Sequence, residues 1–343
     1  MRRRLGLGQH RRGAWLAALL ALACCIGSAT QANESHAASV LPAATDDARL
    51  SRNQALFGIA LLDADEQAEL QRQLHALAPQ RPGLVDMYVL GFGGDASERV
   101  FRNEIHFLDA LMRQRLHAGG RIVTLVNDGS GDAYAKPWPW ASRANLRSSL
   151  QRLGHVMDRN EDVLLVYMTM HGSTDHRLHV QLPDGTAETL SPQELGDALD
   201  EAGIRHRVIV LSACYAGGFA ERLRNDDTLF IAAARADRAS FGCGPDSNVT
   251  YFGRAWLVEG LNRTTSFVSA FNHAKARVSA WEKREGAEPS LPQIAIGRNI
   301  GGRLRAWEAG TIPGLAVAYP FPLRFDGAMA AGTSAQGAAS SSR

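Results

Sequence analysis

The sequence predicts an α/β protein in which a mainly parallel sheet lies between two layers of helices. Strand-like and helix-like segments alternate along most of the chain, which is typical of parallel sheets with helical crossovers. The strand-like segments are short apolar runs, and several end at glycine or at a polar residue. With 343 residues, of which 45% are hydrophobic, the chain is long enough to bury a sizeable core.

The first 32 residues have the features of an export signal, namely arginines, a short apolar run and then small residues. The apolar run is shorter than a membrane span. Two outcomes stay open: cleavage after Thr30–Ala32, which gives a secreted or periplasmic protein, or lipidation of Cys24, which gives an outer-membrane lipoprotein. A cytosolic chain with an apolar first helix is the remaining alternative.

The remaining chain is predicted to form a linker, one folded domain and a tail. Residues 33–48 are small and polar, residues 49–326 carry the alternating elements, and residues 327–343 are of low complexity and predicted to be disordered. The net charge of +2 is more than accounted for by the five arginines of the signal. We therefore expect no nucleic-acid partner, and membrane contact only through a lipid at Cys24.

The first half of the domain is predicted to contain three helices and two strands. Leu70, Leu74 and Leu77 share one face of a helix, and paired glycines follow both a strand and a helix. The predicted elements are a helix over 54–78, a strand over 84–94, a helix over 100–116, a strand over 121–127, a loop over 131–143 and a helix over 143–157.

The second half continues the alternation with three strands. A helix over 191–203 has Ser191 at its start, Glu194 three residues later and Gly203 at its end, all of which are helix signals. The other elements are strands over 162–169, 206–212 and 228–234 and helices over 251–261 and 266–285.

Two of these strands run directly into reactive side chains. The strand over 162–169 is followed by His171-Gly172, and the strand over 206–212 is followed by Cys214. Functional groups of a parallel sheet collect at the carboxyl ends of its strands. If the two strands are neighbours, a thiol nucleophile and an imidazole base lie side by side, as nucleophilic catalysis requires.

The neighbouring residues suit this chemistry. Residues 215–223 are predicted to start a helix, and a helix N-terminus and an imidazole both favour a thiolate at Cys214. The N–H of Gly172 and that of Cys214 are candidates for an oxyanion hole. Structural explanations compete, because a histidine at a strand end is often a hydrogen-bonding residue and a buried cysteine is often inert. A Cys214–Cys243 disulfide is a further alternative in an oxidising compartment.

The order of motifs resembles the legumain family of cysteine peptidases, in the caspase–haemoglobinase clan. The resemblance covers roughly residues 84–297 and rests on four segments: YMTMHGS, IVLSACYAGGF, LFIAAARADRASFGC and TYFGRAW. It implies a caspase-like α/β/α fold, a general base at His171, a nucleophile at Cys214 and an oxyanion donor at Gly172. The implied reaction is hydrolysis of peptide bonds through a thioester acyl-enzyme, without a cofactor.

The resemblance also implies residues that contact the substrate, namely Ser212, Ser240, Phe241 and Arg254. The segment with Ser240 and Phe241 corresponds to the family's substrate-lining loop, where an extended peptide can pair with the backbone. In the family's plant and animal enzymes the positions of Ser212 and Arg254 are acidic and help to recognise asparagine. We therefore expect an acidic residue to be preferred before the scissile bond. The aspartate before the family's histidine is Met170 here, and its supporting asparagine has no clear match.

Three other functions compete with a peptidase. Zinc hydrolysis could use His171, Asp175, His176 and His179, but residues 172–175 have the composition of a turn, which does not give the helical spacing of such sites. A transpeptidase or ligase would use the same acyl-enzyme with an amine as acceptor. A non-catalytic exported binding protein would keep the fold without a reactive thiol. We expect no metal at the site.

Overall fold

The computed structural model describes residues 64–129 and 138–323, all of which belong to one compact unit, residues 51–343. The predicted export signal, linker and tail, and part of the predicted loop over 131–143, lie outside the described residues. Of the helix predicted over 54–78, residues 64–78 are described; residues 64–75 are helical, and the helix ends three residues earlier than predicted. No helix in the described part of the chain is both long enough and apolar enough to cross a membrane.

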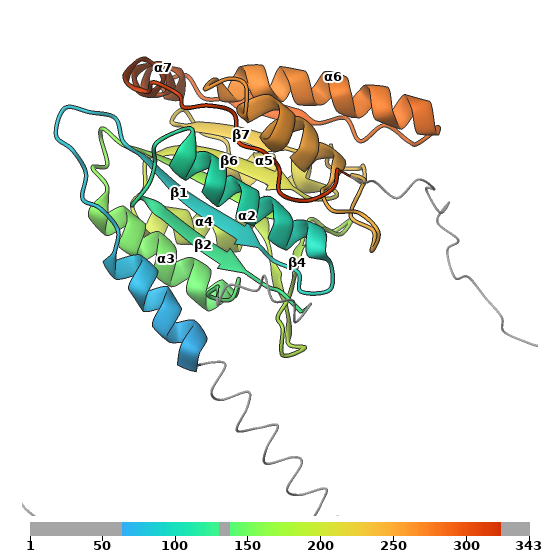
Figure 1. Ribbon diagram of the computed structural model, residues 1–343, viewed down its shortest axis with the longest axis horizontal. Coiled ribbons are helices and arrows are strands. Elements are labelled where there is room, and N and C mark those ends of the chain that lie inside the picture. The colour runs from blue at the N-terminus through green and yellow to red at the C-terminus, as the bar shows by residue number, and fades with distance from the viewer. Residues whose placement is uncertain (1–63, 130–137, 324–343) are drawn as a thin grey trace, which may run out of the picture. The chain divides into compact units, whose positions relative to one another are not determined.

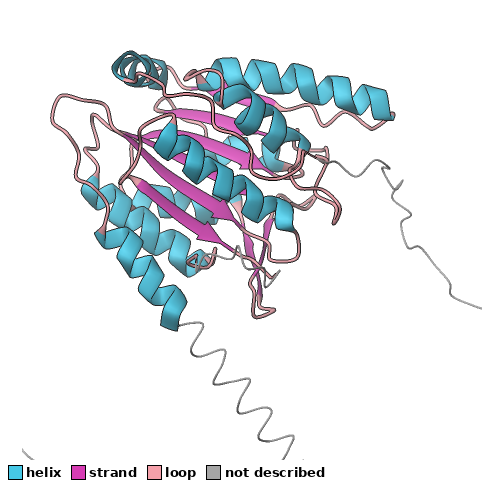
Figure 2. Cartoon of the chain, viewed as in Figure 1, coloured by secondary structure: helices cyan, strands magenta, loops and turns pink. Residues whose placement is uncertain are grey.

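The described unit is built on a six-stranded sheet in the order β2-β1-β3-β6-β7-β8, and the five strands predicted from the sequence are confirmed (Figures 1 and 2). All neighbouring pairs are parallel except β7 and β8. The strands are β1 (Met87–Gly93), β2 (Ile122–Val126), β3 (Val163–Thr169), β6 (His206–Ser212), β7 (Thr228–Ala232) and β8 (Gln293–Ile296). β8 is not predicted from the sequence because it is a four-residue edge strand whose side chains remain partly or fully exposed.

Helices cover both faces of the sheet, so the predicted three-layer α/β/α sandwich is confirmed (Figure 1). On one face lie α2 (Arg99–Gln114), η2 (Gly253–Leu261), α6 (Phe267–Glu285) and α7 (Ile300–Gly310). On the other lie the helix 64–75, α3 (Arg143–Val156), α4 (Pro192–Glu201) and the short η1 (Ala216–Phe219) and α5 (Ala220–Leu223). Alternate residues of each strand enter the two cores, as the two-residue period of a strand requires.

Several helix ends follow from local sequence. Ser191 and Glu194 form a capping box at the start of α4, where each side chain bonds the other residue's backbone N–H. Gly286 ends α6 in the left-handed conformation. The segment predicted as an ordinary helix over 251–261 is a π-helix over Gly253–Leu261. A small antiparallel hairpin, β4 (Leu178–Gln181) and β5 (Ala187–Leu190), forms a second, two-stranded sheet. Backbone bonds between Gln181 and residues 94 and 96 join it to the segment that follows β1.

A buried carboxylate at the start of β3 makes stability depend on pH. Asp162 accepts hydrogen bonds from the backbone N–H of Asp86 (2.9 Å) and of Asp158 (2.8 Å). Its side chain is buried, and burial is the main reason that its pKa is raised to about 6. A carboxyl whose folded pKa exceeds its unfolded value contributes stability that is full below about pH 4 and is lost as the pH rises through 6.

We expect Asp162→Asn to remove this loss. Between pH 4.5 and 7.5 the free energy of unfolding of the wild type should fall by about 2 kcal/mol relative to that of the variant, since each pKa unit is worth about 1.4 kcal/mol. Urea unfolding at four pH values measures the two slopes. Parallel pH dependences in the two proteins would contradict the assignment.

Candidate active site

The sheet brings the predicted histidine and cysteine to the same edge. β3 and β6 are adjacent and parallel, with Thr169 paired to Ser212 in the last register position. His171 and Cys214 each follow two residues later, so both continue on the face of the sheet that carries α2 and η2. The expectation that these two strands are neighbours is confirmed.

Gly172 lies against the backbone of Cys214, which explains why a glycine follows the histidine. A Cβ at position 172 would lie 2.2 Å from the carbonyl oxygen of Cys214. Since no side chain fits at that distance, only glycine allows the two strand ends to approach so closely. The contact shows that the His-Gly and Ala-Cys motifs meet in space.

The direction of the Gly172 backbone N–H leaves it available to a substrate oxygen. Gly172 forms an antiparallel bridge with Leu178, and the bonds of that bridge belong to flanking residues: Ser173 N–H to Arg177 O (3.0 Å) and His179 N–H to His171 O (2.9 Å). The N–H of Gly172 therefore faces away from the hairpin. Within the described part of the chain, neither this N–H nor that of Cys214 has a protein acceptor. Both remain available as donors to a substrate oxygen.

The thiol of Cys214 is held by the segment that was predicted to contact substrate. The N–H of Ser240 donates to the sulfur at 3.2 Å, and the thiol lies 3.5 Å from the carbonyl oxygen of Ser240. Tyr215, with φ of 56°, bonds the carbonyl of Arg238 through its N–H at 2.8 Å. The N–H of Ser240 therefore bonds the nucleophilic sulfur and stabilises negative charge on it.

The prediction of a helix directly after Cys214 is wrong. Residues 216–219 form a short 3₁₀ turn, and α5 has only four residues. Gly217 and Gly218 have low helix propensity, and the N–H of Gly217 bonds the carbonyl of Ala234 (2.9 Å) instead. The expected helix dipole is consequently small, and the sulfur instead accepts a hydrogen bond from the N–H of Ser240.

His171 is half-buried, and its electrostatic surroundings favour the neutral imidazole. Its ring meets the ring of Phe101 edge-on, with centroids 5.1 Å apart. Burial lowers its pKa below 6.5, the nearby charge of Asp95 opposes that change, and His179 adds to it. A neutral imidazole at neutral pH is the form that can accept a proton.

Asp95 is a site residue that the sequence analysis did not single out. It is buried at the end of β1, next to β3, and its Oδ1 accepts bonds from the N–H (2.8 Å) and the hydroxyl (2.5 Å) of Ser97. Its position directly after the GFGG segment is the signal that could have found it, because it also follows the carboxyl end of a strand.

We expect Asp95→Asn to move the acid limb of the kcat/KM profile to lower pH. The carboxylate raises the pKa of His171, so its removal lowers that pKa further and keeps the imidazole neutral in more acidic solution. Rates measured from pH 4.5 to 8 test the shift. Asp175→Asn is the matched control, because Asp175 is exposed and bonds Ser173. An unchanged or alkaline-shifted limb in Asp95→Asn would contradict the role of this carboxylate.

A buried carboxylate lies behind Ser212. The hydroxyls of Ser212 and Thr250 are 3.3 Å apart, and Glu104 of α2 accepts bonds from Thr250 N–H (2.8 Å) and the Tyr167 hydroxyl (2.7 Å). Burial raises the pKa of Glu104. A Cβ at Gly253 would lie 2.1 Å from Glu104 Oε1. The first residue of the π-helix is therefore glycine, because a side chain at this position would clash with the carboxylate. Glu104 was not predicted from the sequence; the signal that could have found it is an acid at helical spacing from the apolar residues Val100, Phe107 and Leu111.

The structure places Arg254 in a different setting from the one that the acid preference assumed. Its Nε bonds Glu259 at 2.9 Å, and its guanidinium lies over the ring of Trp281 at 5.0 Å. Glu259 is also paired with Arg277 (3.0 Å). The charge of Arg254 is therefore compensated locally, and a carboxylate, Glu104, stands near Ser212. We therefore no longer expect a preference for acidic residues, and a substrate contact of Arg254 stays a prediction.

The remaining candidates are placed as follows. Phe241 is partly buried, its ring centroid lies 6.2 Å from that of Tyr251, and its carbonyl accepts the Tyr251 N–H (2.9 Å). Cys214 and Cys243 are both free thiols. Burial is the main reason that the pKa of Cys243 is raised to about 12, and the nearby Cys214 adds to this shift.

The ring of His176 occupies the space where a Cβ of Gly218 would lie. The described residues contain no group of three or more metal-binding side chains.

The comparisons with known proteins agree with the two motifs. The model of the Peptidase C13 family matches residues 144–303, a segment that contains β3, β6 and both reactive side chains. Over this segment the chain is similar to the Peptidase C13 family. This is the legumain family that the motifs resemble, and the match supports a cysteine peptidase.

Two further comparisons add no information on activity. Caspase-1 from Spodoptera frugiperda, a solved structure, is 14% identical, with a TM-score of 0.41 over 62% of this chain and 87% of the caspase chain. No curated protein matches the sequence.

Proposed function

We propose that this protein is a cysteine endopeptidase that hydrolyses peptide bonds with Cys214 as nucleophile and His171 as general base. The observation that carries the proposal is the meeting of the two strand ends, where Gly172 contacts the Cys214 carbonyl and two backbone N–H groups remain without protein acceptors among the described residues. Nucleophile, base and oxyanion donors are the parts that acyl transfer requires.

The proposed reaction has two stages. His171 takes the proton of the Cys214 thiol, the sulfur attacks the substrate carbonyl, and the N–H groups of Gly172 and Cys214 bind the oxyanion. His171 then gives the proton to the leaving amine, which leaves a thioester on Cys214. Water, activated by the same imidazole, hydrolyses the thioester and restores the thiol.

The substrate is proposed to lie along the segment that follows β7. Ser240 stabilises the attacking sulfur through its N–H and stands beside the bond to be cut. Ser212 lies on the face of the sheet that carries the nucleophile. Its hydroxyl contacts Thr250, whose N–H bonds Glu104. We propose that Ser212 forms the floor of the first specificity site. Phe241 is proposed to contact the peptide beyond it.

The proposed site of action is outside the cytoplasm, because residues 1–32 have the composition of an export signal. Expression of the full chain and of Cys24→Ala, followed by separation of membrane and soluble fractions, tests export and lipidation together. A mass increase on Cys24 in the membrane fraction indicates a lipoprotein, cleavage at Ala32 indicates a soluble exported protein, and a full-length cytosolic chain contradicts export.

A peptide-library cleavage profile of the purified protein is the most informative test of the activity. Products are expected from internal peptide bonds, together with a thioester adduct on Cys214 detected by mass spectrometry after rapid acid quench. Added hydroxylamine shows whether an amine competes with water for the acyl group. A thiol at position 214 that neither cleaves any library member nor reacts with a neutral alkylating reagent would establish a non-catalytic protein.

A further inference from the structure

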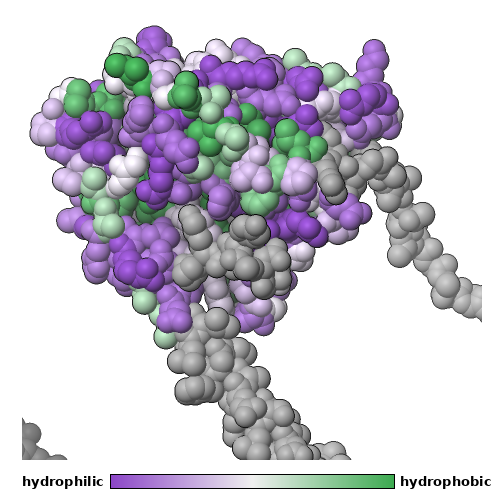
Figure 3. Space-filling model, in the orientation of Figure 1, coloured by the Kyte–Doolittle hydropathy of each residue, from purple (hydrophilic) through white to green (hydrophobic). Residues whose placement is uncertain are grey.

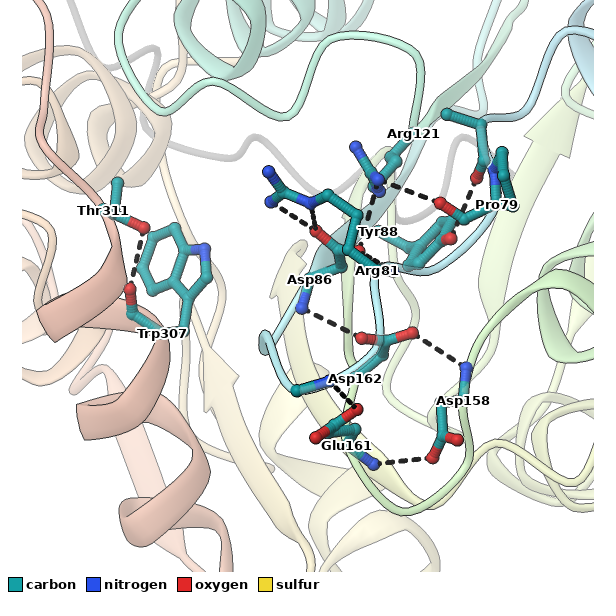
Figure 4. Close-up of polar contacts among 12 residues, drawn as sticks. Pro79, Arg81, Asp86, Tyr88, Arg121, Asp158, Glu161, Asp162, Trp307 and Thr311 are labelled. Carbon is teal, nitrogen blue, oxygen red and sulfur yellow. Dashed lines mark hydrogen bonds and ion pairs between the residues drawn. The ribbon is translucent and has the colours of Figure 1, made fainter.

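The described chain ends in an irregular segment, residues 311–323, which we call the strap. It begins where Thr311 ends α7, with the Thr311 hydroxyl bonded to the carbonyl of Trp307 at 2.7 Å (Figure 4). In Figure 1 the strap is drawn in red and runs from α7 over the helical layer that contains α2 and α6. Since it has no helix or strand ladder of its own, its position depends on its tertiary contacts.

Two reciprocal pairs of hydrogen bonds tie the strap to the ends of α2 and η2. The N–H of Gly314 bonds the carbonyl of Arg115 at 2.8 Å, and the Arg115 guanidinium bonds the carbonyl of Gly314 in return. The side chain of Asn262, which follows η2, bonds both the N–H and the carbonyl of Val317, each at 2.8 Å. Each pair fixes both the position and the register of the strap.

The outer side chains of the strap contribute little to this attachment. Ile312 and Leu315 are 84% and 91% exposed. Figure 3 shows hydrophobic residues at the surface mainly in the upper half of the view, over α7 and the strap. The inward side chains are Val317 and Tyr319, which pack against the core, and the Tyr319 ring meets that of Phe107 edge-on at 5.2 Å between centroids. Directed hydrogen bonds and a few inward side chains therefore hold the strap.

Tyr319 joins the strap to the loop that precedes η2. Its hydroxyl donates to the carbonyl of Asn248 at 2.7 Å, and the side-chain amide of Asn248 donates to the carbonyl of Pro322 at 3.2 Å. The same Asn248 carbonyl accepts a bond from the side chain of Asn103 in α2, at 3.0 Å. Burial is the main reason that the pKa of Tyr319 is raised well above its ordinary value, so the phenol stays a donor at neutral pH.

The loop continues from Asn248 directly to the proposed specificity site. Val249 is fully buried, and the next residue, Thr250, donates its N–H to Glu104 at 2.8 Å. The Thr250 hydroxyl lies 3.3 Å from that of Ser212. One buried residue thus separates the strap-bound Asn248 from the residue that contacts Ser212. A shift of Asn248 is passed on to Thr250, because a tightly packed interior leaves Val249 little room to absorb it.

We propose that Tyr319 is a positioning residue for the first specificity site: through Asn248, the strap holds Thr250 against Ser212. The inference rests on the proposed function, in which Ser212 forms the floor of that site. Loss of the strap contacts should weaken the selection of the substrate side chain and leave the nucleophile and the base intact. His171 and Cys214 are bonded by other segments, the hairpin at His179 and the loop at Ser240.

The test is the discrimination of Tyr319→Phe, in the full chain, between two library-selected peptides that differ only in the residue before the scissile bond. The ratio of their kcat/KM values should fall by about twofold to tenfold, the usual value of one neutral hydrogen bond. Adding Asn248→Ala, which removes the bond to Pro322, should lower the ratio further. The rate at which iodoacetamide alkylates Cys214 should not change in either variant, because this reagent is too small to fill the specificity site.

Tyr88→Phe is the matched control, because it also removes a tyrosine hydroxyl that donates to a backbone carbonyl, that of Ala78 at 2.9 Å. Tyr88 is fully buried near the start of β1, and the control should keep the wild-type ratio. An unchanged ratio in the double variant, an equal fall in Tyr88→Phe, or slower alkylation of Cys214 in Tyr319→Phe would overturn this inference and leave the proposed peptidase intact. A wild type that cleaves no peptide would overturn both.

Discussion

Cys214→Ala is expected to abolish peptide cleavage, with kcat/KM reduced by about four orders of magnitude or more, because the nucleophile that forms the acyl-enzyme is lost. His171→Ala should cause a loss of similar size, since the thiol then has no base. The double variant should lose little more activity than either single variant, because the effects of substituting residues that act as one unit are not additive. Initial rates on one library-selected peptide measure all three variants.

Cys243→Ala is the matched control for this series. The pKa of Cys243 is raised to about 12 by burial, so this thiol stays protonated and unreactive at neutral pH. The control should retain wild-type activity and still be alkylated by iodoacetamide at Cys214. Full activity of Cys214→Ala, or loss of activity in Cys243→Ala with an intact fold, would show that the nucleophile is misassigned.

Gly172→Ala is expected to cause the second largest loss. A Cβ there would lie 2.2 Å from the carbonyl oxygen of Cys214, so the two strand ends must separate. We expect kcat/KM to fall by about a hundredfold to a thousandfold, the usual cost of one misplaced oxyanion donor. Overpacking of the buried edge should also lower the free energy of unfolding by about 1–3 kcal/mol.

Gly119→Ala separates this effect from a general sensitivity to alanine. A Cβ at Gly119 meets nothing within 4 Å, and its backbone is not in the left-handed region, so activity and stability should stay within error of the wild type. Wild-type kcat/KM in Gly172→Ala would contradict both the close approach of the strand ends and the oxyanion role of this residue.

The sequence determined the framework that holds the site. Short apolar runs alternating with amphipathic helices predict a parallel sheet, because each run can be buried on both faces only between two helical layers. His171 and Cys214 follow two such runs, and the rule that parallel strands end at one edge suffices to bring them together. The short hairpin and the exposed edge strand β8 were not predicted, because four-residue strands carry too little periodicity.

Only the tertiary structure decided which groups surround the two reactive side chains. Ser240 reaches the sulfur from 26 positions away, and Glu104 meets Thr250 across 146 positions. Arg254 is occupied by Glu259 and Trp281 rather than standing alone as an uncompensated charge. Local patterns report periodicity and strand ends, but the partner of a polar side chain depends on how distant segments pack. The charge at the specificity site is therefore a property of the packed layers, and no single motif contains it.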